Sequence, residues 1–158
     1  MAGLQWMNHT GFVVGDIERS LPFYRDLLGL KVERDAVLEG DFISHLTGFP
    51  NTRLRIVYLG TGDGRHAVEL LQYLDPVGRR PRRPNGNDVG ASHLGIIVDD
   101  LETLYRDLSF KGVRFVNTPA RREAQYPWAV RAAYVLDPDG NRLEFIERPP
   151  APPGEARV

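Results

Sequence analysis

A segment of eight residues occurs twice in this chain, 84 positions apart, and this repeat restricts the fold more than any other feature of the sequence. Residues 9–16 read His-Thr-Gly-Phe-Val-Val-Gly-Asp, and residues 93–100 read His-Leu-Gly-Ile-Ile-Val-Asp-Asp. Each begins with His-x-Gly, continues with an apolar run and ends on an acidic residue. Because an internal repeat indicates one structural unit built more than once, we expect two copies of one module.

A helix is expected after the repeated segment in each half. The predicted ranges are 17–29 and 101–111, and both contain the sequence Tyr-Arg-Asp-Leu. Asp16 and Asp100 stand directly before them, where a carboxylate accepts hydrogen bonds from the free N–H groups of the first turn. Pro22 is expected in or near the first turn of the first helix, where proline is tolerated.

Strand patterns complete each module. The Gly-rich stretch 60–64 and the sequence Asp-Pro-Asp-Gly at 137–140 are turn signals between strands. The order β-α-β-β-β therefore occurs twice, which predicts an α+β fold. The expected strands after the helices are residues 30–34, 53–59 and 66–73, with a weaker candidate at 42–47, and then residues 113–116, 129–136 and 142–147.

The two modules are expected to form a single domain over residues 1–148, which is an ordinary size for one hydrophobic core. Module 1 takes up about residues 7–74 and module 2 about residues 91–148. Residues 75–90, rich in Pro, Gly and Arg, are interpreted as a linker. The Pro-rich stretch 149–158 is expected to be a disordered tail.

The composition excludes several classes of function. A net charge of −1 gives no overall field that would attract nucleic acid or an anionic membrane. No apolar run approaches the ~18 residues of a membrane span, and the N-terminus lacks the features of a secretory signal. The chain has no cysteine, which excludes disulfides, thiolate ligands and a cysteine nucleophile. We expect a cytoplasmic protein that binds neither nucleic acid nor a membrane.

Each repeated segment places a histidine and a glycine on one face of a strand. Because side chains alternate along a strand, His9 and Gly11 point away from Phe12, and His93 and Gly95 repeat this arrangement. We expect the bulky face to lie under the helices and the face with His and Gly to look into an open concavity.

Each module also ends in a strand that carries a carboxylate among apolar neighbours, Glu69 in Val-Glu-Leu-Leu and Glu144 in Leu-Glu-Phe-Ile. A lone carboxylate there would be costly to bury. A single His or Glu in a strand is more often structural or exposed, but here both recur at equivalent places in the two halves. This favours one site in which His9, Glu69, His93 and Glu144 bind one divalent ion, with donors that suit Zn²⁺, Ni²⁺, Co²⁺, Mn²⁺ or Fe²⁺.

Taken together, these motifs resemble the vicinal oxygen chelate superfamily, which includes glyoxalase I, methylmalonyl-CoA epimerase, extradiol dioxygenases, fosfomycin-modifying enzymes and bleomycin-resistance proteins. The resemblance covers about residues 7–148. It implies that the two βαβββ modules form a cupped mixed sheet with the helices outside, and that the protein is a homodimer. It rests on both His-x-Gly segments, Phe-Tyr…Leu-Gly-Leu at 23–30, Val-Glu-Leu at 68–70, Lys-Gly-Val at 111–113 and Asp-Pro-Asp-Gly-Asn…Leu-Glu at 137–144.

The resemblance also implies a chemistry. In the metal-dependent isomerase branches, the positions that match His9, Glu69, His93 and Glu144 bind the metal. A small substrate with vicinal oxygens loses a proton next to a carbonyl, and the metal stabilises the resulting enediolate before reprotonation. By position Glu144 is the expected base, with Glu69 as the alternative. We therefore expect a lyase or isomerase of the glyoxalase I type.

Three alternatives stay open at this point. Methylmalonyl-CoA epimerases carry Gln in place of Glu69 and a second catalytic Glu near residues 50–53, where this chain has none. However, the 24 positions from Glu69 to His93 resemble an epimerase more than a compact bacterial glyoxalase I. In an extradiol dioxygenase, Glu69 would occupy a position needed by substrate or O₂. A drug-sequestering protein of the bleomycin-resistance type needs none of the four ligands.

Aromatic residues are expected to line the substrate pocket. Tyr126 and Trp128 precede the strand at 129–136, in a position typical of a lid, and Tyr73 is a further candidate. The arginines of residues 79–83 are interpreted as part of a solvated loop, with a clamp on a phosphate or carboxylate as the alternative.

Overall fold

The computed structural model describes residues 3–80, 84–121 and 129–150 of the chain. The chain divides into two compact units, unit 1 (Met1–Arg83) and unit 2 (Pro84–Val158), and each is described by itself. Tyr126, Trp128 and most of the expected tail lie outside the described residues. Within the described ranges, no helix is long and apolar enough to cross a membrane.

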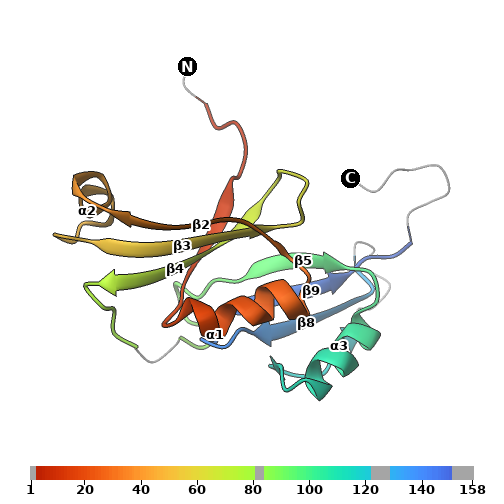
Figure 1. Ribbon diagram of the computed structural model, residues 1–158. Helices are drawn as coiled ribbons and strands as arrows, with labels where there is room; N and C mark the ends of the chain where they lie inside the picture. The colour runs from red at the N-terminus through yellow and green to blue at the C-terminus, as the bar shows by residue number, and fades with distance from the viewer. Residues whose placement is uncertain (1–2, 81–83, 122–128, 151–158) are drawn as a thin grey trace. The chain divides into compact units, whose positions relative to one another are not determined.

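Unit 1 contains a four-stranded mixed sheet with the strand order β1-β4-β3-β2 (Figure 1). Strand β1 runs parallel to β4, and the β4-β3 and β3-β2 pairs are antiparallel. The elements are β1 (His9–Val13), α1 (Ile17–Pro22), the π-helix η1 (Phe23–Leu27), β2 (Lys31–Glu39), α2 (Asp41–Thr47), β3 (Arg53–Gly60) and β4 (Ala67–Asp75).

Unit 2 repeats this topology, with the strand order β5-β9-β8-β6 and the short strand β7 paired with β8. Again the first strand, β5, runs parallel to the last, β9. The predicted α+β fold with two βαβββ modules is therefore confirmed, whereas their union in a single domain stays a prediction. The elements are β5 (Leu94–Val98), α3 (Leu101–Phe110), β6 (Arg114–Phe115), β7 (Ala120–Arg121), β8 (Arg131–Leu136) and β9 (Arg142–Glu147).

The first helix begins as predicted and changes character at Pro22. Asp16 accepts a hydrogen bond from the backbone N–H of Glu18 at 3.0 Å, so it caps the helix. Pro22 is the last residue of α1, so the prediction that it lies in or near the first turn was wrong. Proline has no N–H with which to extend an α-helical ladder. The chain continues as η1, where the Leu28 N–H donates to the Phe23 carbonyl at 3.1 Å, an i→i−5 bond.

The weak strand candidate at residues 42–47 was also wrong, because these residues form helix α2. The helix ends at Gly48, which has a left-handed backbone with φ 76° and whose N–H donates to the Ser44 carbonyl. Ile43 is buried, and Phe42 is exposed. So short an apolar run suits a strand and a helix equally well, and periodicity cannot distinguish them.

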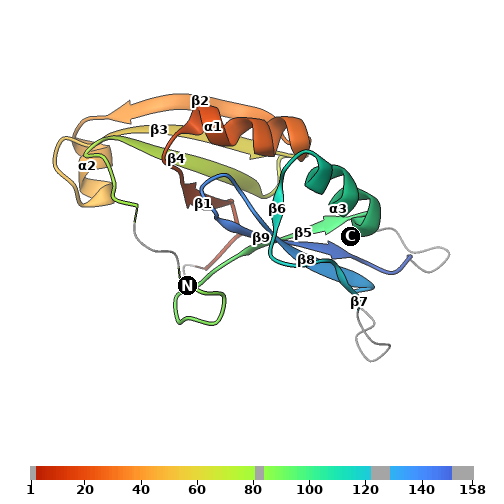
Figure 2. The same cartoon turned by 90° about the horizontal axis from the view of Figure 1, so that it is seen from below.

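The apolar sheet faces lie under the helices. In unit 1, Phe12 is buried and its ring stacks on Tyr24 with centroids 6.4 Å apart, while His9 and Gly11 on the other face of β1 are exposed. Figure 2 shows α1 lying along this sheet. The alternation predicted from the repeated segment is therefore confirmed. The main apolar core of unit 2 contains Leu101, Leu108, Val135, Leu143 and Phe145.

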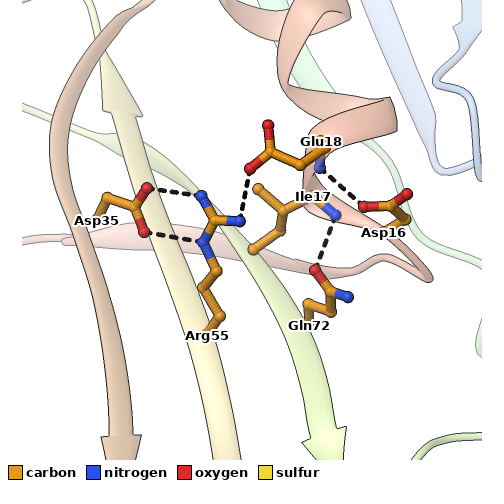
Figure 3. Close-up of polar contacts among 6 residues, drawn as sticks. All are labelled: Asp16, Ile17, Glu18, Asp35, Arg55 and Gln72. Atoms are coloured by element: carbon orange, nitrogen blue, oxygen red, sulfur yellow. Dashed lines mark hydrogen bonds and ion pairs between the residues drawn. The ribbon is translucent and has the colours of Figure 1, made fainter.

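Each helix start is tied to the last strand of its own sheet. The Ile17 N–H donates to the Gln72 side-chain oxygen at 3.0 Å (Figure 3). In unit 2 the Leu101 N–H donates to a carboxylate oxygen of Glu147, also at 3.0 Å. Gln72 and Glu147 occupy equivalent places in β4 and β9, so the repeat extends to the contacts that orient each helix.

An arginine reinforces the same corner of each unit. In unit 1, Arg55 of β3 donates two hydrogen bonds to Asp35 at 3.0 and 2.8 Å and one to Glu18 at 2.7 Å (Figure 3). These bonds hold the pKa of the Asp35 carboxyl below its ordinary value and raise the pKa of the Arg55 guanidinium. In unit 2, Arg131 of β8 occupies the matching place and bonds to Glu147 at 3.0 Å.

Arg55→Met is expected to lower the free energy of unfolding by about 1 kcal/mol at neutral pH, the upper end for a partly exposed ion pair. Because the folded-state pKa of Asp35 is depressed, this stabilisation is present above the unfolded pKa and is lost as pH falls through the folded value. Urea unfolding between pH 7 and pH 2 measures the difference. Arg25→Met, which breaks the exposed pair with Asp26, is the control with a smaller effect. A difference between Arg55→Met and the unmodified protein that persists at pH 2 would contradict the assignment.

Candidate metal centre

His9 and Glu69 lie together on neighbouring parallel strands of unit 1, with Nε2 of His9 3.1 Å from Oε2 of Glu69. The register sets Glu69 beside Gly11 and His9 beside Ala67. A Cβ added to Gly11 would lie 3.5 Å from the Glu69 oxygen and 3.0 Å from a Leu71 methyl carbon. A side chain at position 11 would therefore crowd Leu71 and the Glu69 carboxylate, and glycine avoids this.

His93 and Glu144 form the same pair in unit 2, where Nε2 of His93 is again 3.1 Å from Oε2 of Glu144. Glu144 lies beside Gly95 in the parallel register of β5 and β9. A Cβ on Gly95 would meet a methyl carbon of Ile146 at 3.7 Å, an ordinary contact. Packing within unit 2 therefore does not require this glycine, although the His–Glu geometry is the same.

A tyrosine accompanies each pair, and sequence reasoning missed both. Tyr58 of β3 is in register with Glu69, and Tyr134 of β8 with Glu144. Each ring meets the histidine of its unit edge-on, with centroids 5.2 Å apart in both units. Aligning the final hairpins of the two halves would have revealed them, because each tyrosine stands on the strand before its carboxylate at nearly the same spacing.

The two carboxylates differ in their surroundings. The Glu69 side chain is 10% exposed. The pKa of the neighbouring Tyr58 is raised by burial, then by its hydrogen bond to Glu69 and by the Glu69 charge. The Tyr58 hydroxyl therefore keeps its proton and donates a hydrogen bond to the carboxylate. The Glu144 side chain is 16% exposed, and its ion-pair partner within the described part of unit 2 is His93.

Each unit thus presents one imidazole nitrogen and one carboxylate oxygen as neighbours. Two atoms bound at right angles to one ion, with bonds of about 2.1 Å, lie about 3 Å apart. The 3.1 Å separation in both pairs fits that requirement. Among the described residues, no group of three or more His, Cys, Asp or Glu side chains is assembled. The four predicted ligands come together as two pairs, and their union on one ion stays a prediction.

A cavity of about 460 Å³ in unit 2 includes His93 in its wall. This volume is typical of small-molecule sites. Unit 2 therefore combines a predicted metal ligand with space for a ligand. The other lining residues are Gly86, Asn87, Ala91, Ser92, Val116, Tyr134 and Arg142.

The aromatic residues predicted to line the substrate pocket are not tested by this cavity, whose described wall residues do not include Tyr73. Tyr73 belongs to unit 1, where it packs against the cluster around Ile43 and Leu54 and meets the Phe49 ring at 6.1 Å. Its role in a pocket stays a prediction, as do those of Tyr126 and Trp128. Of the linker arginines, Arg79 and Arg80 are described and exposed.

Comparisons with known proteins agree with this fold and these motifs. The family described as the Glyoxalase/Bleomycin resistance protein/Dioxygenase superfamily matches residues 6–145. Lactoylglutathione lyase from Haemophilus influenzae is 32% identical over 142 residues, which cover 88% of this chain and 90% of that protein. A glyoxalase family protein from Bacillus cereus superposes with a TM-score of 0.82 at 23% identity, over 92% of this chain and 95% of the other. The trypanothione-dependent glyoxalase I of Leishmania major gives 0.63 at 25% identity, over 91% and 87%. The chain therefore belongs to the glyoxalase/bleomycin resistance/dioxygenase superfamily, the vicinal oxygen chelate superfamily that its motifs resemble.

Proposed function

We propose that this protein is a divalent-metal-dependent lyase or isomerase of the glyoxalase I type, which removes a proton next to a carbonyl group. The observation that carries the proposal is the matched His–Glu pair of each unit, with the same 3.1 Å separation in both. A protein that only sequesters a ligand has no need of this duplicated donor set. The 32% identity to a lactoylglutathione lyase supports the same chemistry.

In this proposal His9, Glu69, His93 and Glu144 hold one ion, either within one chain or across a homodimer. Two nitrogen and two oxygen donors fit Zn²⁺, Ni²⁺, Co²⁺, Mn²⁺ or Fe²⁺. Such an ion, when bound, supplies Lewis acidity to a substrate with two neighbouring oxygens. The edge-on contacts between the two tyrosines and these histidines support this arrangement.

Glu144 is the group that we propose as the base. It is the more exposed of the two carboxylates, and two of its neighbours, His93 and Tyr134, line the cavity. Glu69 already accepts a hydrogen bond from Tyr58. Glu144 takes the proton from the carbon next to the carbonyl and, once protonated, delivers it to the neighbouring carbon.

Three other functions differ from this one in where the proton goes or in the use of O₂. An epimerase of acyl-CoA or keto compounds shares the proton removal but returns the proton to the same carbon. An extradiol dioxygenase consumes O₂, and a drug-sequestering protein transfers no proton. The family as described includes glyoxalases, bleomycin-resistance proteins and dioxygenases, so the reaction has to be measured.

The test is a deuterium-exchange screen. The protein, loaded in turn with each of the five ions, is incubated in D₂O with S-lactoylglutathione, 2-oxo compounds and acyl-CoA thioesters, and NMR follows the carbon next to the carbonyl. We expect deuterium to enter at that carbon with at least one thioester or 2-oxo compound and to depend on the ion. Fe²⁺-dependent O₂ uptake with a catechol would establish the dioxygenase instead. If the protein binds one of these compounds tightly and exchanges deuterium into none of them, it would instead be a drug-sequestering protein.

A further inference from the structure

We propose that Arg142 binds an anionic group of the substrate, a carboxylate or a phosphoryl oxyanion, in the cavity of unit 2 beside His93. The proposal rests on the proposed function in one respect, that this cavity receives the substrate. Binding of the anion itself needs neither the ion nor the reaction, so the two proposals can fail separately.

The register of unit 2 places Arg142 next to the predicted site. Arg142 is the first residue of β9 and lies two positions before Glu144, so both side chains leave the strand on the same face. In the parallel pairing of β5 with β9, Leu94 lies beside Leu143. One position earlier on both strands, Arg142 therefore comes beside His93, and both residues line the cavity.

One donor of the Arg142 guanidinium, its Nε, is buried without the hydrogen bond that a buried polar group needs, among the described residues. The central carbon of the guanidinium lies 5.6 Å from the ring centroid of Tyr134, within range of a cation–π contact. On the neighbouring strand, by contrast, Arg131 is paired with Glu147 at 3.0 Å. A cation held this way is stabilised by an oxyanion, whose geometry matches the planar fork of guanidinium donors.

The backbone and the neutral wall residues complete the anion site. Gly86 leaves room for the guanidinium, because a Cβ at that position would run into the Arg142 side chain. Asn87 and Ser92 line the same cavity and provide an amide and a hydroxyl as further donors. The cavity therefore suits a small carbonyl compound that carries one carboxylate or phosphoryl group.

The repeat between the units breaks at this position. In unit 1 the residue two places before Glu69 is Ala67, which is buried and lies beside His9. The residues that pair with the histidines are the same in both units, whereas Ala67 and Arg142 differ in size and charge. Two positions before the carboxylate, unit 2 carries a cation and unit 1 does not, which is expected of a residue that orients the substrate rather than of a residue that holds the ion.

The test uses metal-free protein. Titration calorimetry at pH 8 and low ionic strength measures the binding of pyruvate, methyl pyruvate and inorganic phosphate. We expect pyruvate or phosphate to bind at least about tenfold more tightly than the neutral ester, because a hydrogen bond to a charged group contributes that much or more. Arg142→Met should lose at least about tenfold in affinity for the anion, and Arg142→Lys should lose less, because it keeps the charge without the planar fork.

Arg106→Met is the matched control, because it removes the same charge from a side chain of α3 that is 72% exposed. It should leave anion binding unchanged. Equal affinity of Arg142→Met and the unmodified protein for the anion would overturn the proposal, as would an unmodified protein that binds neither pyruvate nor phosphate more tightly than the ester. If Arg142→Met does not fold, Arg142→Lys and Arg142→Gln are compared in its place.

Tighter binding of phosphate than of pyruvate would identify the anionic group as a phosphoryl group, and the reverse would identify it as a carboxylate. If the unmodified protein holds its ion and exchanges protons but does not bind the anion, this inference alone is overturned.

Discussion

Glu144→Gln is expected to slow catalysed proton exchange by about three orders of magnitude, within the range that a general base contributes. Glutamine keeps the size of the side chain and an oxygen donor, but it does not take up a proton near neutral pH. The affinity for the substrate should change much less, because the lost interaction belongs to the transition state. The rate of deuterium entry and the substrate KM, measured on the same ion-loaded protein, separate the two effects.

Glu69→Gln is the matched control, because Glu69 makes the same contact with its histidine in unit 1. We expect a smaller fall in exchange, since the Tyr58 hydroxyl already bonds this carboxylate. The ion content of both variants is determined first, so that a loss of metal is not mistaken for a loss of base. An unchanged rate in Glu144→Gln, with a large fall in Glu69→Gln, would transfer the role of base to Glu69.

His9→Ala and His93→Ala are each expected to reduce the bound ion from about one per chain to a small fraction of that. Removing even an outer partner of a metal ligand costs about 10–100-fold in affinity, and the loss of one of four direct ligands should exceed this. Each variant is stripped with a chelator, reloaded and analysed for metal content. The ion should also raise the melting temperature of the unmodified protein, because it binds the folded state alone.

His45→Ala is the control for this measurement, because His45 is an exposed histidine of α2 without a counterpart in the repeat. It should bind the ion as the unmodified protein does. A metal content that neither His9→Ala nor His93→Ala alters would show that the four-ligand site is wrong. A loss in one variant alone would confine the site to one unit.

Local patterns in the sequence determined the modules. The repeated segments predicted one strand and one helix per half, and the caps Asp16 and Asp100 fixed where the helices begin, because a cap depends on contacts within a few residues. The alternation of side chains along β1 is also local, and it correctly predicted that Phe12 and His9 lie on opposite faces of the strand. Prediction was wrong where local signals conflicted. Residues 42–47 fit both a strand and a helix. Pro22 lies where α1 changes into a π-helix, and its missing N–H explains this change once it is seen but did not predict it.

The candidate metal centre followed partly from the sequence and partly from the tertiary structure. The sequence predicted that His9 and Glu69 are partners, because their counterparts recur in the other half. Their separation follows from the parallel register of β1 and β4, strands that lie far apart in the chain. Such a register is set by the packing of whole sheet faces, not by local propensity.

Tyr58, Tyr134 and Arg142 were singled out only after their surroundings in the tertiary structure were known. A tyrosine in a strand is unremarkable in sequence, and an arginine at a strand start is expected to be solvated. Only the pairing of β3 with β4 and of β8 with β9 brings the tyrosines beside the carboxylates. Only the walls of the cavity leave Nε of Arg142 buried without a partner among the described residues, because burial is a property of everything that packs around an atom.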